Sequence, residues 1–134
     1  MDGPYRIIQA IRRWCLNAQE PIAMRQIEES KNPDLSAIPK MLRFAAEDAT
    51  RTDINVLKSI FRAAEEHGAD YVSIADTVGI LNPSTALYLV NEIKKTVKTK
   101  ICIHCHNDLG MAVANTLCGA EAGAFQLHTT VNGI

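Results

Sequence analysis

The 134-residue sequence lacks several features that are typical of particular protein classes. Neither sign of charge dominates, since 14 Lys and Arg stand against 15 Asp and Glu, and this argues against a nucleic-acid binder. No apolar run approaches the roughly 18–20 residues of a membrane span, and the N-terminus lacks the apolar core of a secretory signal. Four cysteines are too few for a disulfide scaffold. We therefore expect a cytoplasmic protein with reduced thiols that binds neither nucleic acid nor membrane.

Glycine-rich phosphate loops are missing as well, because the sequence holds neither a G-x-G-x-x-G fingerprint nor a P-loop. What it does contain, from about residue 43 onward, is an alternation of short apolar segments with amphipathic helical patterns. The predicted strands begin near residues 42, 71, 101 and 125, and steps of roughly 25–30 residues are the length of one β/α unit. Such repeats predict parallel strands joined by right-handed crossovers.

Residues suited to helix ends lie at the boundaries of this pattern. Thr52 or Asp53 can cap the start of the first helix, and Asn82 can cap the second. Gly68 and Gly123 stand just after helices, where a left-handed backbone is favoured. The expected strands are 42–47, 71–75, 101–106 and 125–130. The expected helices are 53–67, a helix opening at 82 with the apolar stripe Leu87, Val90, Ile93 and Val97, and 111–122.

Two folds are built from such units, a doubly wound sheet and a (β/α)₈ barrel. The barrel is favoured because alternate strand residues are small or polar, and the reactive ones lie at the carboxyl ends of strands, where barrel active sites gather. A complete barrel takes about 250 residues. We therefore predict an α/β fold that forms the second half of a (β/α)₈ TIM barrel over 43–134, with about four parallel strands and three helices. Residues 1–42 are a separate N-terminal segment, helical or irregular, with a helix expected at 5–16 and a loop at 29–39.

The sharpest local signal is His104-Cys105-His106 in the third predicted strand. Residues i and i+2 of a strand share a face roughly 6.5–7 Å apart, so two imidazoles can hold adjacent positions on one divalent cation. In the alternative, both histidines bond to neighbouring backbone and bind nothing. Cys102 and Cys105 also form a C-x-x-C, but residues three apart on a strand face opposite ways. This spacing argues against a zinc or redox site built on the cysteines.

Polar residues also follow the first two predicted strands. Glu47 faces inward, where it can transfer a proton, approach a metal or accept a hydrogen bond from substrate. Arg51 is a candidate for binding substrate, and the alternative is that it pairs with Asp48 and fixes the loop. Thr77 points inward and can donate to a carboxylate, unless Asp76 and Thr77 only cap a turn.

Two further histidines carry weaker signals. His128 lies in the fourth predicted strand, on one face with Gln126 and Thr130, and it either lines the interior or fills it. His67 follows a helix and is expected at the surface.

Four segments in order resemble a single enzyme family. They are residues 44–53 (FAAEDATRTD), 75–79 (ADTVG), 104–116 (HCHNDLGMAVANT) and 130–134 (TVNGI). Together they are similar to the 2-isopropylmalate synthase, homocitrate synthase and citramalate synthase family, whose barrel superfamily includes hydroxymethylglutaryl-CoA lyase. The resemblance covers residues 43–134.

This resemblance implies an acyltransferase that condenses acetyl-CoA with a 2-oxo acid in a Claisen-type reaction, with 2-isopropylmalate synthase of leucine biosynthesis as the first expectation. It also implies a divalent cation, Mg²⁺, Mn²⁺ or Zn²⁺, that polarises the ketone. His104 and His106 correspond to the metal-binding histidines, and Thr77 to a threonine at the substrate carboxylate. Glu47 corresponds to an inward glutamate near metal and substrate, and we predict that it is catalytic and also contacts substrate. Arg51 is predicted as a further substrate contact.

Two parts of the family pattern are not found. An Asp-Arg-Glu motif on the family's first strand, whose Asp is a metal ligand, has no counterpart in residues 1–42. A Gly-rich stretch ending in an asparagine near the metal would follow Ile134. We therefore expect a truncated half barrel that is inactive alone and exposes two strand edges. It is expected to form a homo-oligomer or to be completed by another chain, and a non-catalytic module of this kind is the alternative to an enzyme.

Overall fold

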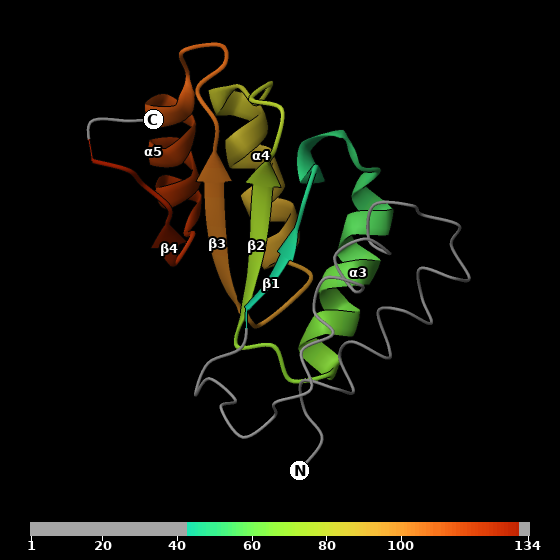
Figure 1. Cartoon of the computed structure of the whole chain (residues 1–134). Coiled ribbons are helices and arrows are strands. Elements are labelled where there is room, and N and C mark those ends of the chain that lie inside the picture. Colours follow the sequence, from blue (N-terminus) through green and yellow to red (C-terminus); the bar gives the residue numbers. More distant parts are fainter. Residues whose placement is uncertain (1–42, 132–134) are drawn as a thin grey trace, which may run out of the picture.

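The computed structural model describes residues 43–131, in which four parallel strands alternate with three α-helices. In chain order the elements are β1 (Arg43–Ala46), the 3-10 turn η2 (Ala49–Arg51), α3 (Ile54–Glu66), β2 (Tyr71–Asp76), α4 (Pro83–Lys94), β3 (Lys100–Cys105), α5 (Ala112–Ala122) and β4 (Gln126–Leu127). The sheet order is β1-β2-β3-β4, so every strand pairs with the next one along the chain. In Figure 1, α4 lies behind β2 and β3, while α3 and α5 lie at the two sides of the sheet. This confirms the predicted α/β architecture.

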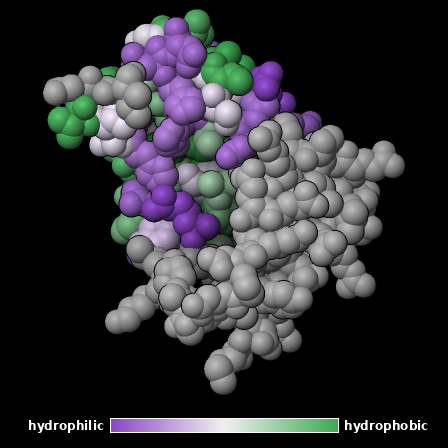
Figure 2. All heavy atoms as spheres, in the orientation of Figure 1, coloured by the Kyte–Doolittle hydropathy of each residue, from purple (hydrophilic) through white to green (hydrophobic). Residues whose placement is uncertain are grey.

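A buried apolar core fills the space between the sheet and the helices. Val72, Ile74 and Ile103 are at most 1% exposed and belong to one cluster with Phe61 of α3. The ring of Phe61 meets Phe44 edge to face, with centres 6.2 Å apart. Because strand side chains alternate between faces, the residues between these apolar positions point to the opposite side of the sheet. On the surface that Figure 2 displays, hydrophilic and apolar residues of the described part are intermixed.

The helix ends follow the capping residues of the sequence. Asp53, rather than Thr52, caps α3, and its carboxylate accepts hydrogen bonds from two backbone N–H groups of the first turn. Asn82 caps α4, where its side-chain oxygen accepts a hydrogen bond from the backbone N–H of Thr85. Gly68 and Gly123 follow α3 and α5 with φ of +91° and +100°, a region that side chains with a Cβ rarely adopt. The predicted left-handed positions are therefore confirmed.

Most predicted bounds differ from the structure by one residue, two differ by more, and one predicted burial was wrong. Leu87 is 40% exposed, because the buried stripe of α4 begins one residue earlier and runs through Ala86, Leu89, Val90 and Ile93. Val97 is buried as expected, but α4 ends before it. The strand predicted over 125–130 is only Gln126–Leu127, which pair with Cys102 and Ile103 of β3. The ladder nevertheless continues to His128, whose backbone N–H donates to Ile103.

Among residues 43–131, no helix has the length and apolar character needed to cross a bilayer. The helix expected at 5–16 and the loop expected at 29–39 lie outside the described residues. The division of the chain into segments 1–42 and 43–134 stays a prediction.

Candidate active site

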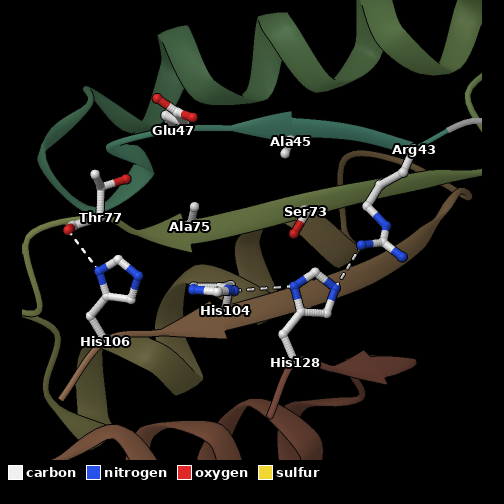
Figure 3. A pocket seen from close by; sticks show the side chains of 9 residues that line it. All are labelled: Arg43, Ala45, Glu47, Ser73, Ala75, Thr77, His104, His106 and His128. Atoms are coloured by element: carbon white, nitrogen blue, oxygen red, sulfur yellow. Dashed lines mark hydrogen bonds between the residues drawn. The ribbon is translucent and has the colours of Figure 1, made fainter. Parts of the chain in front are cut away.

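A hollow of about 280 Å³ opens on the face of the sheet opposite the core. Its lining residues alternate along the strands and are Arg43, Ala45, Glu47, Ser73, Ala75, Thr77, His104, His106 and His128. Figure 3 shows their side chains turned toward one space. The register sets Ala45 beside Ser73, and Ala75 beside His104. Small side chains at the middle of the sheet therefore leave room between larger polar groups at its ends.

Two imidazoles lie side by side on this face, as the strand period predicted. The rings of His104 and His106 have centres 4.8 Å apart and planes inclined by 76°. Nδ1 of His106 donates to the carbonyl oxygen of Thr77 at 2.8 Å. A carbonyl only accepts, so neutral His106 carries its proton on Nδ1 and keeps an electron pair on Nε2. Metal-binding histidines usually have such a bond at the nitrogen away from the metal, so the backbone contact and metal binding are compatible.

The described residues supply part of a metal site and not all of it. Within 43–131 no group of three or more His, Cys, Asp and Glu side chains is placed to hold a metal ion. Neighbouring imidazoles can supply two ligands, and imidazole nitrogen suits Zn²⁺ and other divalent transition metals. The remaining positions would fall to water, to substrate oxygens or to residues outside the described range. His104 and His106 thus fit a partial coordination shell.

A chain of hydrogen bonds leads from His104 to the opposite end of the hollow (Figure 3). Nδ1 of His104 lies 3.3 Å from Nδ1 of His128. Nε2 of His128 accepts from the guanidinium of Arg43 at 3.0 Å. Arg43 also donates to Oε1 of Gln126 at 3.0 Å. Three strands therefore contribute to one connected polar row.

Both linked imidazoles are held in the neutral form. Burial and the neighbouring His106 lower the pKa of His104, and the carboxylate of Asp76 opposes this only in part. Burial, Arg43 and His104 together lower the pKa of His128. Since the ordinary value is 6.5 for each group, both rings are largely neutral at pH 7.

Glu47 and Thr77 lie exposed at the rim of the hollow, at the same end as His106 (Figure 3). Oγ1 of Thr77 accepts the backbone N–H of Asp48 at 2.7 Å, which orients the hydroxyl and leaves its hydrogen able to donate. The structure thus places Glu47, Thr77, His104 and His106 around one space. Their roles toward metal and substrate stay predictions.

Arg51 is not among the residues that line the hollow. Its Nε and Nη2 donate to the carboxylate of Asp48 at 2.8 Å and 2.6 Å. This hydrogen bond and the charge of Asp48 raise the pKa of Arg51. The geometry matches the alternative in which the two residues pair and fix the loop, and substrate binding by Arg51 stays a prediction.

Asp76 has a structural role, because it is buried and holds the turn that follows β2. Its carboxylate is 0% exposed and accepts from the hydroxyl of Thr50 and from the backbone N–H groups of Ile80 and Leu81. It thereby holds the turn after β2, so the capping alternative applies to Asp76. Thr77, the next residue, faces the hollow instead.

The two cysteines of β3 face opposite ways, as the strand period predicted. Sγ of Cys102 donates to Oε1 of Gln126 at 3.3 Å. Cys105 packs against the apolar core on the helix side. Burial raises the pKa of both thiols, so neither is poised as a thiolate ligand or nucleophile.

The contact between Arg43 and His128 was missed at the level of sequence. Arg43 is four residues before Glu47 and so shares its inward face in an alternating strand, and His128 is predicted to line or fill the interior, yet 85 positions separate the two along the chain. The alternation along each strand predicts the side of the sheet on which a side chain lies. It does not predict which side chains on that side contact one another.

A family model described as HMGL-like matches residues 13–134, and so extends ahead of Arg43 into a segment without recognisable motifs. Homocitrate synthase AksA of Methanosarcina acetivorans is 68% identical over 94 residues, which are 69% of this chain and 23% of that protein. 2-Isopropylmalate synthase of Methanocaldococcus jannaschii is 50% identical over 93 residues, 69% of this chain and 18% of that protein. (R)-Citramalate synthase CimA of the same organism is 43% identical over 112 residues, 84% of this chain and 22% of that protein. The chain thus spans less than a quarter of the length of these three relatives.

Solved structures with a similar fold include the carboxyl transferase domain of Rhizobium etli pyruvate carboxylase with pyruvate and biocytin. It matches with a TM-score of 0.56 and 22% identity over 65% of this chain and 16% of that chain. The T882A form of the same enzyme, crystallized without acetyl coenzyme-A, matches with a TM-score of 0.58 and 18% identity over 92% of this chain and 14% of that chain. At such identities the likeness concerns the fold alone, and it confirms the predicted TIM-barrel arrangement of the parallel strands.

Proposed function

The chain belongs to the HMGL-like family, and on this premise we propose that it forms part of an acyltransferase that condenses acetyl-CoA with a 2-oxo acid. Relatives at 43–68% identity are named homocitrate, 2-isopropylmalate and citramalate synthases. The observation that carries the proposal is the convergence of Glu47, Thr77, His104 and His106 on one hollow. They lie toward the carboxyl ends of parallel strands, where the active sites of barrel enzymes form.

Each of these side chains has a part in the proposed reaction. His106 would hold a divalent cation through its free Nε2, with His104 as the neighbouring ligand. When bound, Mg²⁺, Mn²⁺ or Zn²⁺ supplies Lewis-acid polarisation of the ketone. The hydroxyl of Thr77 donates to the carboxylate of the 2-oxo acid. Glu47, at the rim, accepts a hydrogen bond from substrate or moves a proton as the acetyl methyl is deprotonated.

The identity of the 2-oxo acid separates three candidate activities. A branched apolar 2-oxo acid leads to 2-isopropylmalate, pyruvate leads to citramalate, and a 2-oxo acid with a second carboxylate leads to homocitrate. The sequence motifs favour the first, the step of leucine biosynthesis. The identity of 68% to a homocitrate synthase supports the third equally. Arg51 is retained in the proposal as a further substrate contact.

The activity is tested on the complete protein encoded by the transcript, read across both ends of this chain. We expect release of the CoA thiol from acetyl-CoA with one of the three 2-oxo acids, lost with a chelator and restored by a divalent cation. Glu47→Gln is expected to lower turnover by about 100-fold, a typical contribution of a proton-transfer group. Glu121→Gln, on the exposed side of α5, is the matched control. Absence of release with every 2-oxo acid would contradict the proposal and favour a non-catalytic module.

We further propose that the sheet is completed by additional residues or by another chain. Among the described strands β1 pairs only with β2, and β4 only with β3. Unpaired strand edges favour association. Sedimentation velocity of the 134-residue chain is expected to give a homo-oligomer. A stable monomer with well-dispersed chemical shifts would count against association.

A further inference from the structure

We propose that Arg43 and His128 hold His104 in a tautomer that cannot bind a metal ion through Nε2. Capture of a cation by both His104 and His106 then requires a hydrogen bond of this row to break, either the one between His104 and His128 or the one between His128 and Arg43. Arg43 and His128 are positioning residues in this scheme, because they act through His104. The inference rests on the metal site proposed above and deepens it.

The first step concerns the proton of His128. The guanidinium of Arg43 has only N–H donors and no acceptor, and it stays charged at every relevant pH. Its contact with Nε2 of His128 at 3.0 Å therefore requires an electron pair on that nitrogen. A neutral imidazole carries one proton, so His128 holds its proton on Nδ1.

The second step carries this assignment to His104. Nδ1 of His128 is 3.3 Å from Nδ1 of His104, and only one of the two can be the donor. His128 already accepts at its other nitrogen, so it donates here and His104 accepts. Neutral His104 consequently carries its proton on Nε2. A protonated imidazole nitrogen has no electron pair for a metal ion, so this tautomer cannot bind through Nε2.

The neighbouring histidine is in the opposite state. His106 donates from Nδ1 to the carbonyl of Thr77 at 2.8 Å, which leaves Nε2 free. The two rings are 4.8 Å apart, yet only His106 offers an electron pair without rearrangement. A cation can therefore bind His106 first, and His104 joins after its proton moves or after its Nδ1 parts from His128. Either route breaks the hydrogen bond between His104 and His128 or the one between His128 and Arg43.

The tautomers are read directly from long-range ¹H–¹⁵N spectra of the metal-free chain. Protonated and unprotonated ring nitrogens differ strongly in ¹⁵N shift. We expect His128 and His106 protonated on Nδ1, and His104 protonated on Nε2. A proton on Nε2 of His128, a proton on Nδ1 of His104, or exchange between tautomers at either residue would overturn the proposal.

Affinity for Zn²⁺, measured by competition with a chromophoric chelator, provides the second test. His128→Phe keeps a ring and removes both nitrogens, and we expect it to tighten Zn²⁺ binding by up to about 10-fold, because it removes one hydrogen bond that binding would otherwise have to break. Unchanged or weaker binding overturns the proposal. Arg43→Met is expected to act in the same direction, because His128 can then move its proton to Nε2 and accept from His104.

Arg43→Met also removes a positive charge, which by itself favours a cation. The double variant separates the two causes. If Arg43→Met adds nothing in the His128→Phe background, the effect passes through His128 as proposed. If Arg43→Met tightens binding equally in both backgrounds, the effect is electrostatic and the proposed restraint on His104 is wrong.

Failure of the proposed metal site gives a different pattern. If His106→Ala binds Zn²⁺ as well as the unaltered chain does, the histidine pair is not the metal site. If His106→Ala loses Zn²⁺ binding while His128→Phe leaves the affinity unchanged, the proposed metal site is supported. The proposed restraint of His104 by Arg43 and His128 is then wrong. The spectra of the metal-free chain decide the tautomers in both cases.

Discussion

His106→Ala is expected to weaken Zn²⁺ binding by at least about 100-fold, since loss of a partner behind a metal ligand already costs about 10–100-fold and His106 is proposed as a ligand itself. Its ring is exposed, and the bond from Nδ1 to Thr77 leaves Nε2 free. Chelator competition on the 134-residue chain measures the change. His104→Ala is expected to have a smaller effect, because the Nε2 of His104 carries a proton in the metal-free state.

A matched histidine outside the hollow serves as the control for this experiment. His67 caps the end of α3, and its Nδ1 lies 2.7 Å from the carbonyl oxygen of Ala63. His67→Ala should therefore leave Zn²⁺ affinity unchanged. Equal losses in His67→Ala and His106→Ala would indicate unspecific binding and would remove the support for a site at the histidine pair.

Phe61→Ala is expected to lower the free energy of unfolding by about 3–5 kcal/mol, the usual result of deleting a buried aromatic ring. Phe61 is 0% exposed and meets the ring of Phe44 edge to face. The loss combines the transfer of the ring to water with the cavity left between α3 and β1. The free energy of unfolding of a small domain is only about 5–15 kcal/mol, so this variant is expected to retain little of its stability.

Equilibrium denaturation in urea measures this loss, with Arg62→Ala as the control. Arg62 is the next residue of α3 and is exposed, so its replacement should change the free energy of unfolding by less than about 0.5 kcal/mol. A loss below about 1 kcal/mol for Phe61→Ala would mean that neighbouring side chains close the cavity. The core of the described residues would then be packed less closely than the burial of its side chains indicates.

The faces of the strands were predictable because a strand has a period of two, whatever its neighbours. His104 in β3 and His106 just after it share a side of the sheet for this reason, and Cys105 faces the helices. Gly68 and Gly123 were predictable as helix-end residues because their requirement is local. Features that depend only on residues close by in the chain, such as strand faces and helix ends, were therefore predictable from the sequence.

Contacts between strands were not predictable in the same way. The alternation places Arg43 and His128 on the inward side, but their bond depends on how far each strand is shifted against its neighbours. Arg51 had two available partners, and the short distance along the chain to Asp48 decided where its guanidinium lies. Leu87 shows the same limit on a helix, because a shift of one residue moves the buried stripe past it.

The sheet order β1-β2-β3-β4 also bears on how the chain emerges during synthesis. Each strand docks beside the strand translated just before it, so the ladder can extend in the direction of translation. Within residues 43–131, β2 can pair with β1 before β3 is translated, and each later strand has its first neighbour already present. Because the chain is synthesised from its N-terminus, this topology allows the sheet to grow by whole β/α units.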